Sequence, residues 1–207
     1  PLFTNAQDLA RVEAFKMQYG APVWVAMEYR YMPPIAALKD RFESVTGGLK
    51  MLSIREHRFP FLEKIGDWNR FNANSGGTFV EKCCHFFDLM RLLTGSNPTR
   101  IMASGGQAVN HLDEIYAGAV PDIWEHGYVI VDFENGTKAM LELCMFAEGA
   151  HFQEEISVVG PRGKIEAFVP GPTRFWMNQS QRAPDPKLII SPRHSGLREE
   201  LEIPVDP

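Results

Sequence analysis

The spacing of apolar residues predicts two helices and one strand in the first fifty residues. Segment 4–7 fits a capping box, and apolar positions then recur at helical spacing over 9–19 before a glycine ends the pattern. Segment 23–31 is apolar and aromatic, which favours a strand. Two prolines then open a helix over 33–46, which ends at a glycine pair. The chain therefore starts with mixed helical and extended structure.

Most of the second half is predicted to form strands. Asn135-Gly136 supplies a residue pair suited to a tight type I′ turn, and Gly160 to Gly163 supplies a second turn. Turns of this kind join antiparallel strands, and apolar residues on both faces of 128–133 fit helices on one face and a partner subunit on the other. The expected strands are 49–58, 100–107, 128–134, 137–147, 154–159 and 164–169, with shorter ones near Arg174, Leu188 and Leu201.

The segment 76–95 is predicted to be one helix in which charged residues interrupt core-forming side chains. Glu81, His85 and Asp88 fall at i, i+4 and i+7, so they share one stripe, with Lys82 beside it. Charges on a helix that is apolar elsewhere must be paired, hydrogen-bonded or facing a cleft. The alternative is a solvated polar edge with Glu81 and His85 as an i, i+4 pair.

Composition excludes several classes of protein. The 207 residues are 44% hydrophobic and 23% charged with a net charge of −5, which does not indicate a nucleic-acid partner. An apolar run long enough to span a membrane is missing. Three cysteines without CxxC spacing indicate reduced thiols and a cytoplasmic protein. The histidines at 111, 126 and 151 lack metal-ligand spacing, so no metal is predicted.

Several of these features, taken in order, resemble the C-terminal domain of the Gfo/Idh/MocA (glucose-fructose oxidoreductase and inositol dehydrogenase) family. The resemblance spans essentially the whole chain and implies an α+β fold, in which a large, open, mostly antiparallel sheet carries helices on one face. The matching features are the segment Glu28 to Pro33, the pair Trp68-Asn69, Gly76-Gly77 leading into Glu81-Lys82-x-x-His85-x-x-Asp88, the turn Phe133 to Gly136, and Val159-Gly160-x-x-Gly163.

The resemblance also implies how the chain is divided. Pro1-Leu2 looks like the close of the family's Glu-Lys-Pro motif, so residues 1–29 would be the last helix and strand of a dinucleotide-binding domain. Residues 30–207 would then be the substrate-binding and oligomerisation domain. No G-x-G-x-x-G fingerprint occurs in the sequence, so NAD or NADP would be bound mainly by a segment that the chain does not contain.

For the complete enzyme, the resemblance implies NAD(P)-dependent oxidation or reduction of a sugar, a polyol or a related hydroxy compound. An imidazole suits transfer of the hydroxyl proton, which makes His85 the candidate acid/base. Glu81 would orient it or accept a substrate hydrogen bond. Lys82 would polarise the carbinol oxygen; the alternatives are a snorkelling lysine or a pair with Glu81.

Substrate binding is assigned to three further residues. Trp68 and Asn69 could give a stacking platform and an amide for a sugar, although a loop tryptophan can also fill a core. Arg30 follows an expected strand, and a structural salt bridge would explain it equally well.

Two other functions remain open: a non-catalytic ligand-binding or interaction module, and an NAD-dependent glycoside hydrolase. The chain is expected to be inactive alone and to form a homo-oligomer through the sheet face.

Overall fold

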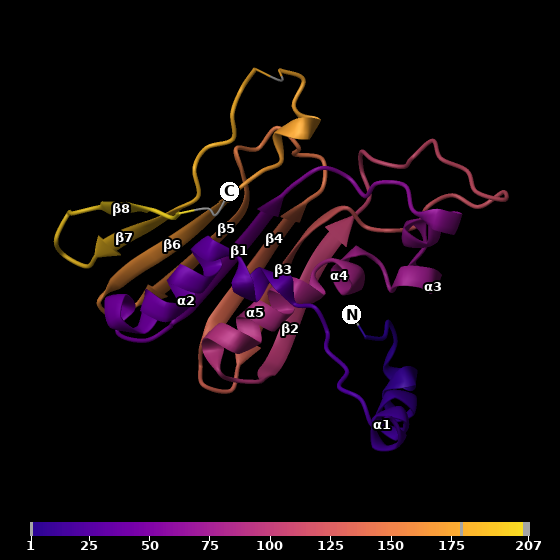
Figure 1. The fold of residues 1–207 in the computed structure, drawn as a ribbon, viewed down its shortest axis with the longest axis horizontal. Helices are drawn as coiled ribbons and strands as arrows, with labels where there is room; N and C mark the ends of the chain where they lie inside the picture. Colours follow the sequence, from indigo (N-terminus) through magenta and orange to yellow (C-terminus); the bar gives the residue numbers. More distant parts are fainter. Residues whose placement is uncertain (1, 179, 205–207) are drawn as a thin grey trace.

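The computed structural model describes residues 2–178 and 180–204, and it is built around one eight-stranded sheet (Figure 1). The strand order is β2-β3-β4-β1-β5-β6-β7-β8. β1 runs parallel to β4, and every other neighbouring pair is antiparallel. The strands are β1 Met51–His57, β2 Pro98–Gly106, β3 His126–Phe133, β4 Lys138–Cys144, β5 Phe152–Gly160, β6 Gly163–Pro170, β7 Lys187–Pro192 and β8 Glu199–Glu202.

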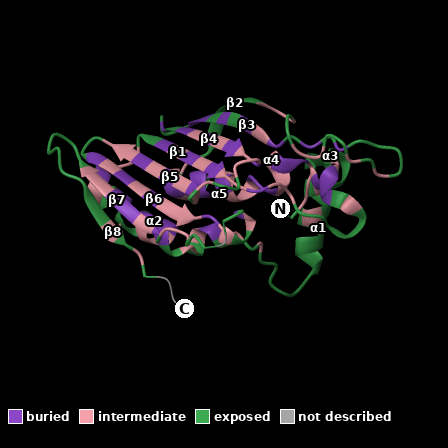
Figure 2. Ribbon diagram, turned by 90° about the horizontal axis from the view of Figure 1, so that it is seen from above, coloured by how far each residue is buried: buried purple, intermediate pink, exposed green. Residues whose placement is uncertain are grey.

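Helices α2 and α5 cover one face of this sheet, as the views in Figures 1 and 2 show. Their apolar faces join the inward side chains of the strands in a single core. The predicted α+β fold with a mostly antiparallel sheet is therefore confirmed. The helices are α1 Leu9–Gln18, α2 Pro33–Thr46, α3 Asn72–Ser75, α4 Thr78–Glu81 and α5 Cys84–Thr94, with short 3-10 turns η1 Ala6–Asp8, η2 Glu28–Tyr31, η3 Ile65–Arg70 and η4 Thr173–Phe175.

Alternation along the strands explains how the sheet separates a core face from an open face. In β1, Leu52, Ile54 and Glu56 are buried, while the residues between them are partly exposed (Figure 2). Glu56 is thus a carboxylate placed where the strand pattern requires an apolar side chain. That position lies at the end of the core nearest to η2 and α4.

The tight turn between β3 and β4 differs from the expected type I′ turn. Gly136 has a φ of 83°, but Asn135 is absent from the positive-φ residues in the described part of the chain. The Gly136 N–H donates to the Phe133 carbonyl, and the Phe133 N–H donates to Thr137. One left-handed residue, supplied by glycine, is therefore enough to close the connection.

Two predicted strands are wrong. Segment 23–27 has no strand partner among the described residues, and 28–31 forms the 3-10 turn η2. The region near Arg174 is likewise a 3-10 turn. A strand needs a neighbour for its backbone groups, and apolar composition alone does not provide one.

The N-terminal helix α1 lies apart from the sheet (Figure 1), and none of its residues is buried. The 3-10 turn η1 precedes it and is capped by Asn5, whose side chain accepts from the Asp8 N–H, so the cap predicted at 4–7 begins one residue later than expected. The N-cap of α1 itself is Asp8, whose side chain makes no capping hydrogen bond. Pro1, which the sequence places at the end of a motif, lies outside the described residues.

The open face of the sheet carries ion pairs at its centre and apolar side chains toward the β2 edge. His57 Nε2 lies 2.9 Å from Glu142 Oε1, and Arg55 pairs with Glu155 on the neighbouring strand. Tyr128 and Ile130 of β3 are 54% and 41% exposed on the same face. The expected apolar face is therefore apolar only in part.

Candidate functional site

The predicted helix over 76–95 is interrupted at Lys82 and Cys83, which separate α4 from α5. The Cys83 N–H bonds to the carbonyl of Thr78, five residues earlier, at 3.1 Å. One extra residue in this turn changes the direction of the side chains that follow. Glu81 and His85 nevertheless line the same cleft.

Two glycines set the start of α4. Gly76 and Gly77 have φ values of 75° and 79°, a backbone conformation that other residues adopt at a cost. A Cβ on Gly77 would lie 2.1 Å from Asn72 Oδ1, and one on Gly76 would lie 2.8 Å from Val80. This glycine pair therefore has a steric role in addition to a conformational one.

The cleft between α4, α5, η2 and the loop after β1 has a volume of about 250 Å³. It brings together the three residues that the sequence proposes as catalytic, which are His85, Glu81 and Lys82. Its lining consists of Glu28, Arg58, Phe59, Phe61, Leu62, Lys64, Glu81, Lys82 and His85.

His85 is a half-buried imidazole whose side chain is 18% exposed. Its Nδ1 lies 3.5 Å from Glu28 Oε2 and has no hydrogen-bond partner among the described residues. The ring packs on Tyr29 with the centroids 5.1 Å apart. Burial lowers the pKa of His85, opposed by the nearby carboxylate of Glu28, so the ring is neutral at neutral pH and can accept a proton.

Glu81 lies on the same wall of the cleft, but it does not pair with His85. No hydrogen bond or ion pair joins the two within residues 2–178 and 180–204, so the alternative of an i, i+4 pair is not observed. Burial raises the pKa of the Glu81 carboxyl, and the positive charges of Lys82, Arg58 and Lys64 oppose that rise.

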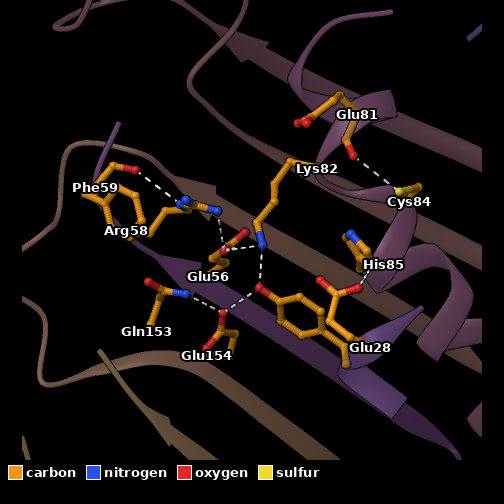
Figure 3. A network of polar contacts seen from close by, with 11 residues as sticks. Glu28, Glu56, Arg58, Phe59, Glu81, Lys82, Cys84, His85, Gln153 and Glu154 are labelled. Carbon is orange, nitrogen blue, oxygen red and sulfur yellow. Dashed lines mark hydrogen bonds and ion pairs between the residues drawn. The ribbon is translucent and has the colours of Figure 1, made fainter. Parts of the chain in front are cut away.

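Lys82 turns inward to a buried network of polar side chains (Figure 3). Its Nζ lies 3.0 Å from Glu56 Oε1 and donates to the Tyr29 hydroxyl. Tyr29 donates in turn to Glu154 Oε1 at 2.8 Å. The lysine side chain is 9% exposed, so neither a snorkelling side chain nor a pair with Glu81 describes it.

The sequence reasoning missed Glu56, Glu154 and Tyr29. The alternation of the strands could have identified Glu56 and Glu154. Each lies two residues from a core-facing isoleucine, Ile54 or Ile156, and therefore on the same face of its strand. Burial raises the pKa of Glu154 to about 7, and the charge of Glu56 adds to that rise. Gln153 Nε2 donates to the same Glu154 oxygen at 2.6 Å.

The three residues proposed for substrate binding lie outside the lining of this cleft. Trp68 is 37% exposed. Asn69 is buried and donates to the carbonyl of Leu62 at 3.1 Å, which holds the loop that forms one wall. Arg30 donates through Nε to Asp88 at 2.5 Å and through a second nitrogen to the same carboxylate, so it ties η2 to α5.

The described residues contain neither a metal cluster nor a membrane-spanning helix. Among residues 2–178 and 180–204, no group of three histidine, cysteine, aspartate or glutamate side chains could hold a metal ion. The helices in the same ranges are too short or too polar to cross a bilayer. All three cysteines are free thiols.

Known proteins resemble both the sequence and the fold. The model of the oxidoreductase family, C-terminal alpha/beta domain, matches residues 43–187. The rhizopine catabolism protein MocA of Rhizobium meliloti is 23% identical over 144 residues, covering 69% of this chain and 42% of MocA.

Two solved structures show the same fold. The WlbA dehydrogenase from Bordetella pertussis, in complex with NADH and UDP-GlcNAcA, matches with a TM-score of 0.65 and 16% identity over 81% of this chain and 50% of its own. The aldose-aldose oxidoreductase from Caulobacter crescentus, complexed with glycerol, matches with a TM-score of 0.68 and 16% identity over 97% and 53%. The chain spans 25% to 48% of the length of the curated relatives that it matches.

Proposed function

Because this chain belongs to the Gfo/Idh/MocA oxidoreductase family, as the match over residues 43–187 establishes, we propose that it is the substrate-binding and oligomerisation domain of an NAD(P)-dependent dehydrogenase. The substrate is a sugar, a polyol or a related hydroxy compound. The observation that carries the proposal is a neutral imidazole, His85, in the wall of a cleft that also holds Glu81 and Lys82.

Four residues of the cleft have distinct parts in this proposal. His85 accepts the hydroxyl proton of the substrate during oxidation and returns it during reduction. Glu28, 3.5 Å away and 57% exposed at its side chain, stabilises the imidazolium and lies open to solvent. Glu81 accepts a hydrogen bond from a second hydroxyl, and Lys82 lends positive charge to the carbinol oxygen as its proton leaves.

The nicotinamide, when bound, supplies the hydride chemistry. The cleft fits this partner because the imidazole of His85 lines it, and its Nδ1 lies 3.5 Å from Glu28 without a hydrogen bond in the described chain, which leaves an acid/base group beside an open space. The glycine-rich turn that receives a pyrophosphate does not occur in the sequence. The cofactor is therefore bound mainly by protein outside these 207 residues.

We assign residues 1–29 to the dinucleotide-binding domain and residues 30–207 to the substrate domain. Exposure supports this division, since α1 buries none of its residues; Phe15 in the helix and Tyr19 directly after it are 52% and 48% exposed. A hollow of about 1020 Å³ beside α1 is lined by residues of the first 25 positions alone. Tyr29, the last residue assigned to the first unit, already packs in the core of the second.

Homo-oligomerisation is assigned to the open face of the sheet. Helices cover the opposite face, and the open face exposes Tyr128 and Ile130.

The free thiols at 83, 84 and 144 fit a reducing, cytoplasmic setting.

Replacing His85 tests the catalytic assignment in the natural full-length protein. His85→Ala should lower kcat for nicotinamide-linked polyol or sugar oxidation by roughly two to four orders of magnitude, because the proton then has no acceptor. His151→Ala, a change of an exposed histidine outside the cleft, should leave kcat unchanged. Unaltered turnover in His85→Ala would remove His85 from the mechanism.

Reaction products separate the competing functions. Oxidation or reduction coupled to NAD(P)H supports the dehydrogenase. Release of an aryl alcohol from an aryl glycoside would instead identify a hydrolase, and ligand binding without turnover would identify a binding module.

A further inference from the structure

Two carboxylates face each other across the central strands on the helix-covered side of the sheet. Glu56 of β1 is the direct neighbour of Glu154 of β5, and their side chains are 0% and 1% exposed. The preceding pair on the same face is Ile54 and Ile156. Like charges placed opposite each other destabilise a sheet, so this pair requires a compensating partner.

The compensating partner is Lys82, which enters from the turn between α4 and α5 (Figure 3). Its ammonium contacts Glu56 Oε1 at 3.0 Å and donates to Tyr29, whose hydroxyl reaches Glu154 at 2.8 Å. Arg58 also lies near the Glu56 oxygen, at 3.5 Å. Glu56 Oε2 has no partner in the described chain. The polar contacts of the Glu56 carboxylate are therefore those with Lys82 and Arg58.

Stability alone does not account for this arrangement. A buried ion pair gains little over apolar side chains of similar size, because both charges lose their hydration. The neighbouring positions on these strands are filled by isoleucines. Glu56 itself is not part of the lining of the cleft, but the two cations that contact it, Lys82 and Arg58, both line that cleft.

We propose that Glu56 is a positioning residue, which fixes the ammonium group of Lys82 at the floor of the cleft, with Glu154 acting on the same group through Tyr29. The fixed ammonium presents one oriented positive charge to a substrate oxygen. The effect on turnover rests on the proposed dehydrogenase function, whereas the effect on Lys82 itself does not.

Reductive methylation of the folded chain measures how firmly Lys82 is held. Lys82 should react roughly tenfold or more slowly than Lys64, an exposed lysine of the same cleft, because it must first break its contact with Glu56. Glu56→Gln should raise the Lys82 rate by about tenfold and leave the Lys64 rate unchanged. Peptide mass spectrometry resolves the two sites.

Two further variants keep this test decisive. Glu125→Gln alters another buried carboxylate, which is 2% exposed and accepts from the backbone of residues 108–110. It should not change the Lys82 rate. If Glu56→Gln does not fold, Glu56→Asp withdraws the carboxylate by one methylene and should also raise the rate. A folded Glu56 variant whose Lys82 reacts at the wild-type rate would overturn the proposal.

Turnover in the full-length protein tests the consequence for function. Glu56→Gln should lower kcat about tenfold with little change in KM, and it should cause no further loss in a Lys82→Met background. An equal loss in that background would show that Glu56 acts other than through Lys82. If the wild-type protein oxidises no hydroxy compound, the proposed function fails, and the methylation rates still decide the role of Glu56.

Discussion

At the scale of single residues, the proton on Glu154 is the feature that links burial to pH. The carboxyl is 1% exposed, and the ionisable groups that act on it are Glu56, Lys82 and Tyr29. Burial raises its pKa to about 7, with the charge of Glu56 as the next cause. In the unfolded chain the same carboxyl titrates near its ordinary value of about 4.3. The folded protein therefore holds a proton that the unfolded chain has already released between these two values.

This difference predicts a stability that falls as pH rises. Between about pH 4.5 and 7, Glu154 lowers the free energy of unfolding by about 1.4 kcal/mol per pH unit, since the native state binds one more proton than the unfolded state. Glu154→Gln should remove this slope. Urea denaturation of both chains at several pH values measures it.

Wild type must be compared with Glu154→Gln because His85 changes the free energy of unfolding with pH in the opposite direction. Its pKa is lowered on folding, so its contribution to stability rises with pH toward its ordinary value. The difference between wild type and Glu154→Gln cancels that contribution. An identical slope in both chains would show that Glu154 is ionised throughout.

At the scale of elements, the glycine pair before α4 sets the direction of the helix that carries Glu81. Gly77 combines a φ of 79° with a close neighbour, because a Cβ at this position would lie 2.1 Å from Asn72 Oδ1. Asn72 is itself held by Asp122, whose carbonyl accepts from Asn72 Nδ2 at 2.8 Å. The side chain of Asn72 therefore has little freedom to move away.

Gly77→Ala should destabilise the chain by about 2 kcal/mol or more, through backbone strain and the clash with Asn72 together. Gly20→Ala is the matched control, because Gly20 has no positive φ and its Cβ would meet nothing within 4 Å. Chemical denaturation followed by circular dichroism measures both. Equal stability of the two variants would contradict the steric role of Gly77.

At the scale of the whole molecule, local patterns predicted most of the elements. Prolines and glycines bounded α2, and apolar segments between turn signals located the eight strands of the described chain to within a few residues. The strand predicted to begin at residue 23 is wrong because an apolar composition does not show whether a partner strand lies beside the segment, and the described chain provides none. The turn at Lys82 and Cys83 was missed because a five-residue hydrogen bond has no local sequence signature.

The candidate site was predicted only where its residues are close in sequence. Glu81, Lys82 and His85 come from one segment, and the structure brings them to one cleft. Glu56 and Glu154 become neighbours through strand pairing between distant parts of the chain, so no pattern within either segment could show that they meet.

The open face of the sheet makes a prediction about assembly. If two copies pack through this face, Ile130→Lys should weaken the oligomer, because it places a charge among the exposed apolar side chains of β3. Leu197→Lys changes a more exposed apolar residue outside the sheet, 71% against 41% for Ile130, and should have no effect. Sedimentation equilibrium distinguishes them. A wild-type chain that stays monomeric at high concentration would refute the interface.

The position of β1 has a consequence for how the protein is made. In the described part of the chain, β1 is the only strand that joins β2-β3-β4 to β5-β6-β7-β8, yet it leaves the ribosome before either group. The backbone groups on its two edges are paired only after β4 and β5 have been synthesised, and such non-local pairing is slow. Glu56 lies near the end of this strand, so the cleft floor is completed only at the step that closes the sheet.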